Sequence, residues 1–131
     1  MHRNVKADQI IKARELHKGI KVLVHPECEE PVRDLADFIG STGAIIKYAT
    51  EHDDKQYLIV TEQGVLHELQ KKNPDKEFFM PYGSMTCVNM KKTHIEDLYN
   101  SLKNMQYEVK IDEQVRIKAY KALMNMHILG R

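Results

Sequence analysis

The chain has only two cysteines, no excess of charge of one sign and no long apolar run. Cys28 and Cys87 are far apart and form no C-x-x-C pair, so the sequence alone encodes neither a zinc site nor a disulfide framework. Twenty Lys and Arg side chains against nineteen Asp and Glu give a formal charge of +1. This balance indicates neither a nucleic acid nor an anionic membrane as a partner.

No apolar stretch approaches the roughly 20 residues that a membrane-spanning helix requires, and the N-terminal residues do not open a signal peptide. We therefore expect a soluble, cytoplasmic protein that does not contact a membrane. A length of 131 residues with 42% hydrophobic residues is enough for one domain with a modest core.

Short apolar stretches rich in β-branched residues alternate along the chain with stretches of helical periodicity. Residues 20–24 are almost continuously apolar, which is typical of a strand buried on both faces of a parallel sheet. We expect Asn4 to cap the first helix, and Thr93 with Glu96 to form the capping box of a later one. The expected strands cover residues 20–24, 37–39, 57–60, 77–80 and 107–111, and the expected helices cover about residues 5–17, 31–36, 44–49, 65–72, 94–102 and 112–128.

This alternation predicts an α/β fold, a three-layer αβα domain with a mostly parallel sheet of four or five strands. No linker or low-complexity segment divides the chain. In open parallel sheets, ligands bind at the carboxyl ends of the strands. Polar loops are expected at that edge at residues 25–28, 40–43, 61–62 and 81–90.

The first of these loops contains His25 and Glu27, separated by Pro26, which stiffens the turn. Residues two apart in an extended turn project to the same side, so an imidazole and a carboxylate could serve as hydrogen-bond donor and general base. The alternative is a structural turn with a solvated Glu.

The second loop, Gly40-Ser41-Thr42-Gly43, connects an expected strand to an expected helix. Its backbone N–H groups and hydroxyls could bind a carboxylate or phosphate at the helix N-terminus. The alternative is simple N-capping by Ser41 or Thr42. The loop is not a Walker motif, because no G-K-[ST] follows.

Cys87 lies in a long loop near Lys91 and Lys92, which would favour a thiolate able to bind a metal. The alternative is an incidental thiol, and we expect Cys28 to be a packed one.

Five fragments taken together, in their order and spacing, resemble the quinolinate synthase family. The similarity runs over nearly the whole chain but covers only the last of the three similar α/β domains of that family. It implies that residues 1–131 form this domain, with residues 1–18 entering as a helix from the preceding domain and residues 112–131 forming a C-terminal helix. The fragments are V-H-P-E-C (24–28), A-D-F-I-G-S-T-G (36–43), T-E-x-G (61–64), N-P-x-K-x-F (73–78) and C-x-x-M-K (87–91).

The resemblance implies a 4Fe-4S cluster bound by three cysteines, one from each domain, with one iron open to act as a Lewis acid. Cys87 matches the third ligand. His2 matches the histidine of a C-x-x-H motif whose cysteine, the second ligand, is missing from this chain, and the resemblance implies that His2 binds substrate. A single cysteine cannot hold the cluster, so the chain alone is expected to lack the cofactor and to be inactive.

The resemblance also implies a substrate site and a reaction, the condensation of iminosuccinate with dihydroxyacetone phosphate to quinolinate, a precursor of NAD. His25, Pro26 and Glu27 match the substrate-contacting residues of the family, and Thr42 matches a residue that hydrogen-bonds a substrate carboxylate. Ser41 is its neighbour. Glu27 would move protons, and His25 would bind the intermediate.

Three kinds of partner follow from the resemblance: the two substrates, the two remaining domains, and an L-aspartate oxidase or dehydrogenase that supplies iminosuccinate. Apolar surface normally covered by the other domains would be exposed, which predicts self-association of the chain alone. One competing hypothesis is a standalone α/β module that binds an anionic metabolite on residues 40–43 without catalysis, and another is a scaffold domain with no site.

Overall fold

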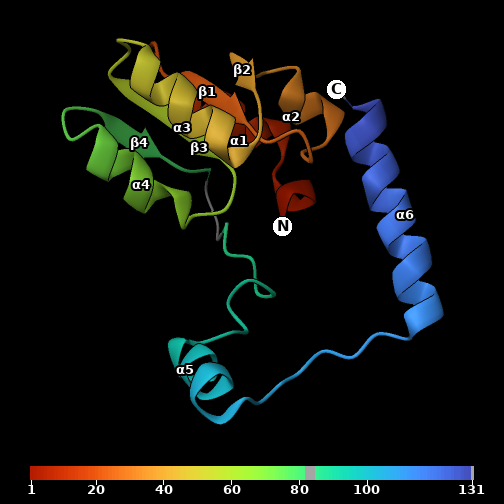
Figure 1. Cartoon of the computed structure of the whole chain (residues 1–131). Coiled ribbons are helices and arrows are strands. Elements are labelled where there is room, and N and C mark those ends of the chain that lie inside the picture. Colours follow the sequence, from red (N-terminus) through yellow and green to blue (C-terminus); the bar gives the residue numbers. More distant parts are fainter. Residues whose placement is uncertain (82–84, 131) are drawn as a thin grey trace. The chain divides into compact units, whose positions relative to one another are not determined.

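The structure, a computed structural model, describes residues 1–81 and 85–130 of the chain. The chain divides into two compact units, Met1–Met90 and Lys91–Arg131. The first unit contains the whole sheet, and the second contains two helices, α5 and α6 (Figure 1). That residues 1–131 form one domain stays a prediction.

The first unit is built on a four-stranded, all-parallel sheet with the strand order β2-β1-β3-β4. Its α/β architecture and its parallel strands confirm the fold predicted from the sequence. The apolar runs of β1 and β3 form the two central strands, as expected for strands covered on both faces. The strands are β1 (Lys21–Val24), β2 (Phe38–Ile39), β3 (Gln56–Val60) and β4 (Glu77–Phe79).

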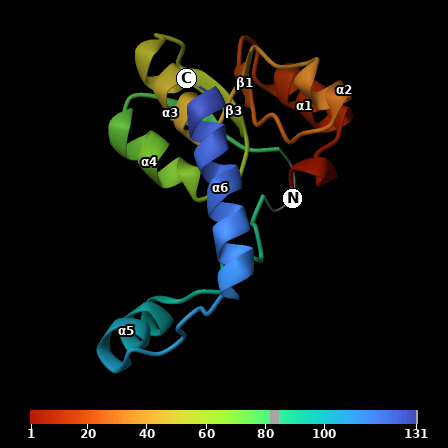
Figure 2. The same ribbon diagram turned by 45° about the vertical axis from the view of Figure 1, so that its right-hand side comes forward.

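Helices cover both faces of this sheet, which makes three layers (Figure 2). The helices of the unit are η1 (His2–Asn4, a 3-10 turn), α1 (Ala7–Leu16), α2 (Glu30–Arg33), α3 (Thr42–Glu51) and α4 (Val65–Lys72).

Alternate residues of the central strands point to opposite faces and join two separate cores. Val22 of β1 packs on one face with α1 and α2, and Leu23 packs on the other with α3 and α4. Both residues are fully buried. The near-continuous apolar character of β1 therefore results from its two covered faces.

The N-terminal segment differs from the prediction in one detail. Asn4 does not cap the first helix, because residues 2–4 form the 3-10 turn η1 and the N-cap of α1 is Lys6. The Lys6 N–H donates to the side-chain oxygen of Gln9 (2.8 Å), which stabilises this first turn. The 3-10 turn matters for the site, since it carries His2.

The second unit contains α5 (Ile95–Asn104) and α6 (Glu113–Leu129). The capping box of α5 lies one residue later than predicted, with His94 at the N-cap and Asp97 at the third helical position. The strand predicted at residues 107–111 is wrong, and with it the five-stranded alternative. Its alternating pattern is present, but Tyr107 has a φ of 64°, outside the extended region, and these residues pair with no strand among the described residues.

Candidate functional site

The carboxyl ends of β1 and β3 lie side by side at the centre of the sheet. The chain leaves β1 toward β2 on one side and then crosses to β3 on the other, so this is the point where the winding direction reverses. Ligands of open α/β sheets bind at such switch points. The residues that follow the two strands, His25 and Thr61, are therefore the first place to look for a site.

The loop after β1 is held in a defined conformation by backbone hydrogen bonds. The His25 N–H donates to the Val60 carbonyl (3.1 Å), which ties the loop to β3. The Cys28 N–H donates to the His25 carbonyl (3.0 Å), which closes a turn around the exposed Pro26. The Arg33 side chain of α2 donates to the Cys28 carbonyl (2.6 Å) and so holds the end of this turn. The turn thus has a structural role, and it also presents two polar side chains.

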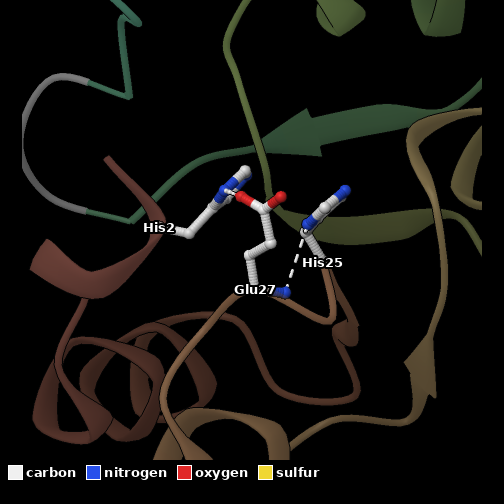
Figure 3. Close-up of side chains that lie close together, drawn as sticks. All are labelled: His2, His25 and Glu27. Atoms are coloured by element: carbon white, nitrogen blue, oxygen red, sulfur yellow. Dashed lines mark hydrogen bonds and ion pairs between the residues drawn. The ribbon is translucent and has the colours of Figure 1, made fainter. Parts of the chain in front are cut away.

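His2 reaches this loop from the 3-10 turn η1 and stacks on His25, with ring centroids 4.3 Å apart and planes 7° from parallel (Figure 3). Its Nδ1 lies 3.0 Å from Oε2 of Glu27, and its Nε2 lies 3.2 Å from Oγ1 of Thr61. A carboxylate accepts, so the Nδ1–H of His2 donates to Glu27. Four side chains from three separate segments thus form one group, the His2–His25–Glu27–Thr61 cluster.

The electrostatics of the cluster favour a neutral His25. Desolvation by burial, followed by the neighbouring His2, lowers the pKa of His25, and the Glu27 carboxylate offsets this only in part. Its Nδ1 accepts a hydrogen bond from the Glu27 backbone N–H (3.3 Å), which leaves the proton on Nε2. The cluster therefore combines a neutral N–H donor with an exposed carboxylate, a pair suited to hydrogen bonding and proton transfer.

Ser41 and Thr42 lie at the N-terminus of α3, after β2. Ser41 is the N-cap, and its Oγ accepts a hydrogen bond from the Ala44 N–H (3.3 Å). The capping alternative is thus confirmed for Ser41, which does not prevent the helix N-terminus from binding an anion. Thr42 begins the helix as an exposed residue.

The two cysteines differ in accessibility. Cys28 is 1% exposed, its Sγ lies 3.9 Å from the Val60 carbonyl, and burial raises the pKa of its thiol, as expected of a packed thiol. Cys87 is half-buried. Two residues before it, the Met85 carbonyl accepts a hydrogen bond from the Gln63 N–H (3.1 Å). This bond joins the segment that bears Cys87 to the loop after β3. Part of the long loop predicted at 81–90, residues 82–84, lies outside the described residues.

Cys87 is the one thiol in the described part of the chain that is not buried. An iron–sulfur cluster is held by several cysteine thiolates, so the thiols present do not suffice to hold one. Of the two cysteines, only Cys87 is accessible enough to serve as a ligand, so this chain could supply at most one thiolate to such a cluster.

Most of the predicted site residues follow strand β1, β2 or β4, and His2 precedes β1. Side-chain contacts bring only some of them together. His2, His25 and Glu27 lie together. The contacts of the cluster do not extend to Thr42 or Cys87 among the described residues, so a common site of all these side chains stays a prediction. Sequence reasoning missed Thr61, which is 1% exposed. Its loop, residues 61–62, was expected at the ligand-binding edge of the sheet, but nothing in the sequence indicated that the Thr61 side chain itself takes part in the site.

No helix in the described part of the chain combines the length and the apolar character that crossing a bilayer requires. The fold and the cluster define an α/β domain of the doubly wound class, with a histidine–carboxylate site at its switch point.

Known proteins match this chain over almost its whole length. The family model described as quinolinate synthetase A protein matches residues 1–128. The chain is 55% identical over 130 residues to the quinolinate synthase of Clostridium novyi (strain NT) and 49% identical over 129 residues to that of Clostridioides difficile (strain 630). It is 46% identical over 130 residues to the quinolinate synthase of Clostridium perfringens (strain 13 / Type A). The chain belongs to the quinolinate synthetase A family.

The matched regions cover 98% of this chain for the first two relatives and 99% for the third. They cover 43%, 42% and 43% of the relatives themselves. The chain thus spans about two fifths of the length of the curated relatives it matches.

Proposed function

We propose that this chain is the C-terminal domain of a quinolinate synthase, which condenses iminosuccinate with dihydroxyacetone phosphate to quinolinate for NAD biosynthesis. Family membership supports the proposal, and the cluster of His2, His25 and Glu27 at the switch point of the sheet carries it. The rest of the site would come from two further domains, and an L-aspartate oxidase or dehydrogenase would supply iminosuccinate.

Glu27 is the proposed proton-transfer group. Its side chain is 72% exposed in this chain and its one described side-chain partner is His2, so a substrate can reach the carboxylate. Condensation and dehydration both require a group that removes a proton at one step and returns it at another, which a carboxylate beside an imidazole can do.

His25 and the N-terminus of α3 are the proposed binding groups for a dicarboxylate. The Nε2–H of a neutral His25 donates to an oxygen of the intermediate, and its lowered pKa keeps it neutral near pH 7. The Thr42 hydroxyl and the N–H groups of the first turn of α3 favour a carboxylate, because they donate and because the helix dipole is positive there.

Cys87 is the proposed ligand to a 4Fe-4S cluster, with the other cysteines in the other domains. When bound, such a cluster supplies Lewis-acid polarisation of a substrate oxygen. The chain alone would bind no cluster and would be inactive, because one thiolate cannot hold it and part of a site cannot exclude water.

Two substitutions in the full-length enzyme test this function, with exposed His67 on α4 as the matched control. Glu27→Gln should reduce quinolinate formation by roughly 10²- to 10⁴-fold and leave the iron content unchanged. Cys87→Ala should abolish the iron–sulfur absorbance together with activity, and His67→Ala should alter neither. Unchanged turnover in Glu27→Gln would remove Glu27 from the mechanism, and normal iron in Cys87→Ala would contradict the ligand assignment. A full-length protein without activity would favour the binding module.

A further inference from the structure

His2, His25 and Glu27 each offer one ligand atom, and these atoms all lie within 4.8 Å of one another. Two imidazoles and one carboxylate form a donor set that zinc enzymes use, with a fourth position left to water. We propose that these three side chains bind a single divalent transition-metal ion of the Zn²⁺ class, independently of any iron–sulfur cluster. The proposed function uses these same side chains for substrate, but it places no metal ion on them.

Two adjustments bring the three donors onto one ion: the donor atoms, which all lie within 4.8 Å of one another, change their spacing, and the stacked His2 and His25 rings turn out of parallel so that both lone pairs meet the ion. Donors about 2.1 Å from a tetrahedral ion are separated by roughly 3.4 Å. The Nδ1 of His2 and the Oε2 of Glu27 are already 3.0 Å apart. Glu27 has an exposed, flexible side chain, and the hydrogen bond that its backbone N–H donates to His25 Nδ1 is long, at 3.3 Å. An ion can replace that weak bond without disturbing the sheet.

Thr61 supplies the outer contact that metal-binding histidines usually have. With Nδ1 of His2 on the ion, its Nε2–H donates to the buried Oγ1 of Thr61, which lies 3.2 Å away. A ring nitrogen bonded to the metal and the other bonded to a protein oxygen is the common arrangement, and it fixes the tautomer and the ring orientation. The Thr61 hydroxyl thus holds His2 in the orientation that metal binding requires.

The cluster is accessible and has a suitable charge. A hollow of about 210 Å³ lined by Met1, His2, Arg3 and Glu27 gives an ion and its water a way in. The guanidinium of Arg3 pairs with Glu29 (3.5 Å), so the described partner of the Glu27 carboxylate is an imidazole rather than a competing cation. Two neutral imidazoles and one carboxylate leave one positive charge on a bound divalent ion, which attracts an anionic water or ligand.

Equilibrium dialysis with Zn²⁺ on the metal-free 131-residue chain tests the site. The chain would carry Cys87→Ser throughout, because an accessible thiol is an alternative zinc ligand. We expect one bound Zn²⁺ per chain. Glu27→Gln and His2→Ala should each weaken binding at least about tenfold, and Thr61→Val by roughly tenfold, while His67→Ala should leave it unchanged.

Co²⁺ as a substitute probe adds a readout of the ligands themselves. Its visible absorption should show nitrogen and oxygen coordination in the parent chain and change in Glu27→Gln, an exposed substitution that leaves the fold intact. Zinc binding that survives both Glu27→Gln and His2→Ala, or no binding by the parent chain, would overturn the proposal. Since no iron, sulfide or substrate is present, failure here would leave the proposed function untouched.

Discussion

Helices α4 and α5 have similar lengths and similar patterns but very different surroundings. Val65 and Leu69 of α4 are buried against the sheet. No residue of α5 is buried, and its four apolar side chains, Ile95, Leu98, Tyr99 and Leu102, are each more than half exposed. Helical periodicity therefore predicts where a helix forms, but burial requires a neighbouring layer, which α4 has in its own unit.

The difference implies different sources of stability. Tertiary packing stabilises α4, whereas α5 depends on local interactions such as the His94 N–H donating to Asp97 (2.8 Å). A ten-residue helix without packing is marginal in water. The exposed apolar side of α5 is also the kind of surface that a further domain or a second copy would cover.

A matched pair of truncations tests the comparison with the largest effect. Leu58 of β3 is fully buried and Leu102 of α5 is 71% exposed. We expect Leu58→Ala to lower the free energy of unfolding by about 2–5 kcal/mol through lost burial and a cavity. Leu102→Ala should change it by no more than about 0.5 kcal/mol. Denaturant titration of the whole chain measures both, and an equally large loss for Leu102→Ala would mean that α5 is covered in solution.

A pair of glycines near the N-terminus of α3 gives a smaller contrast within the sheet unit. A Cβ on Gly40 would come within 2.6 Å of the Phe38 ring and 2.9 Å of the Ala44 Cβ, whereas one on Gly43 would meet nothing within 4 Å. Gly40→Ala should cost about 1–3 kcal/mol by overpacking. Gly43→Ala, in the first turn of α3, should be neutral or stabilising by up to about 1 kcal/mol. Thermal unfolding of both variants measures the contrast, which would disappear if Phe38 moved freely.

The parts of the fold that sequence predicted best are those in which local pattern and tertiary surroundings agree. The apolar runs in β1 and β3 predicted central strands that are covered on both faces. Because the strands are parallel, the loops that follow them lie at the same edge of the sheet. His25 and Glu27 could be predicted as a pair because both lie in the short loop between β1 and α2.

The contacts that sequence could not predict join segments far apart in the chain. His2 meets Thr61 across 59 positions, and this contact depends on the 3-10 turn that replaces the predicted start of α1. Nothing in the spacing of the two residues indicates it. The failed strand at residues 107–111 shows the converse, because alternation alone forms no strand when none of the strands in the described part of the chain pairs with it.

Tyrosines in the two units allow the finest test of the comparison. Tyr57 of β3 is fully buried and donates to the His52 carbonyl (3.1 Å), which also accepts from Lys76 (2.6 Å). That carbonyl keeps a partner when the hydroxyl is removed, so Tyr57→Phe should cost only about 0.5–1 kcal/mol at pH 7. Tyr99 of α5 is 57% exposed, and Tyr99→Phe should have no measurable effect.

At alkaline pH, the stability of the chain should respond differently to the two tyrosine substitutions. Burial, with a smaller effect of Asp54, raises the pKa of Tyr57 from 10.0 to about 12. The unfolded chain therefore loses this proton more readily, and the stabilisation is complete below pH 10 and disappears as the pH rises through about 12. Between these values the parent chain should lose stability faster than Tyr57→Phe, which has no such group, whereas Tyr99→Phe should follow the parent. Parallel curves for the parent and Tyr57→Phe would mean that water reaches the ring, and the contrast between a covered sheet and an uncovered helix would weaken accordingly.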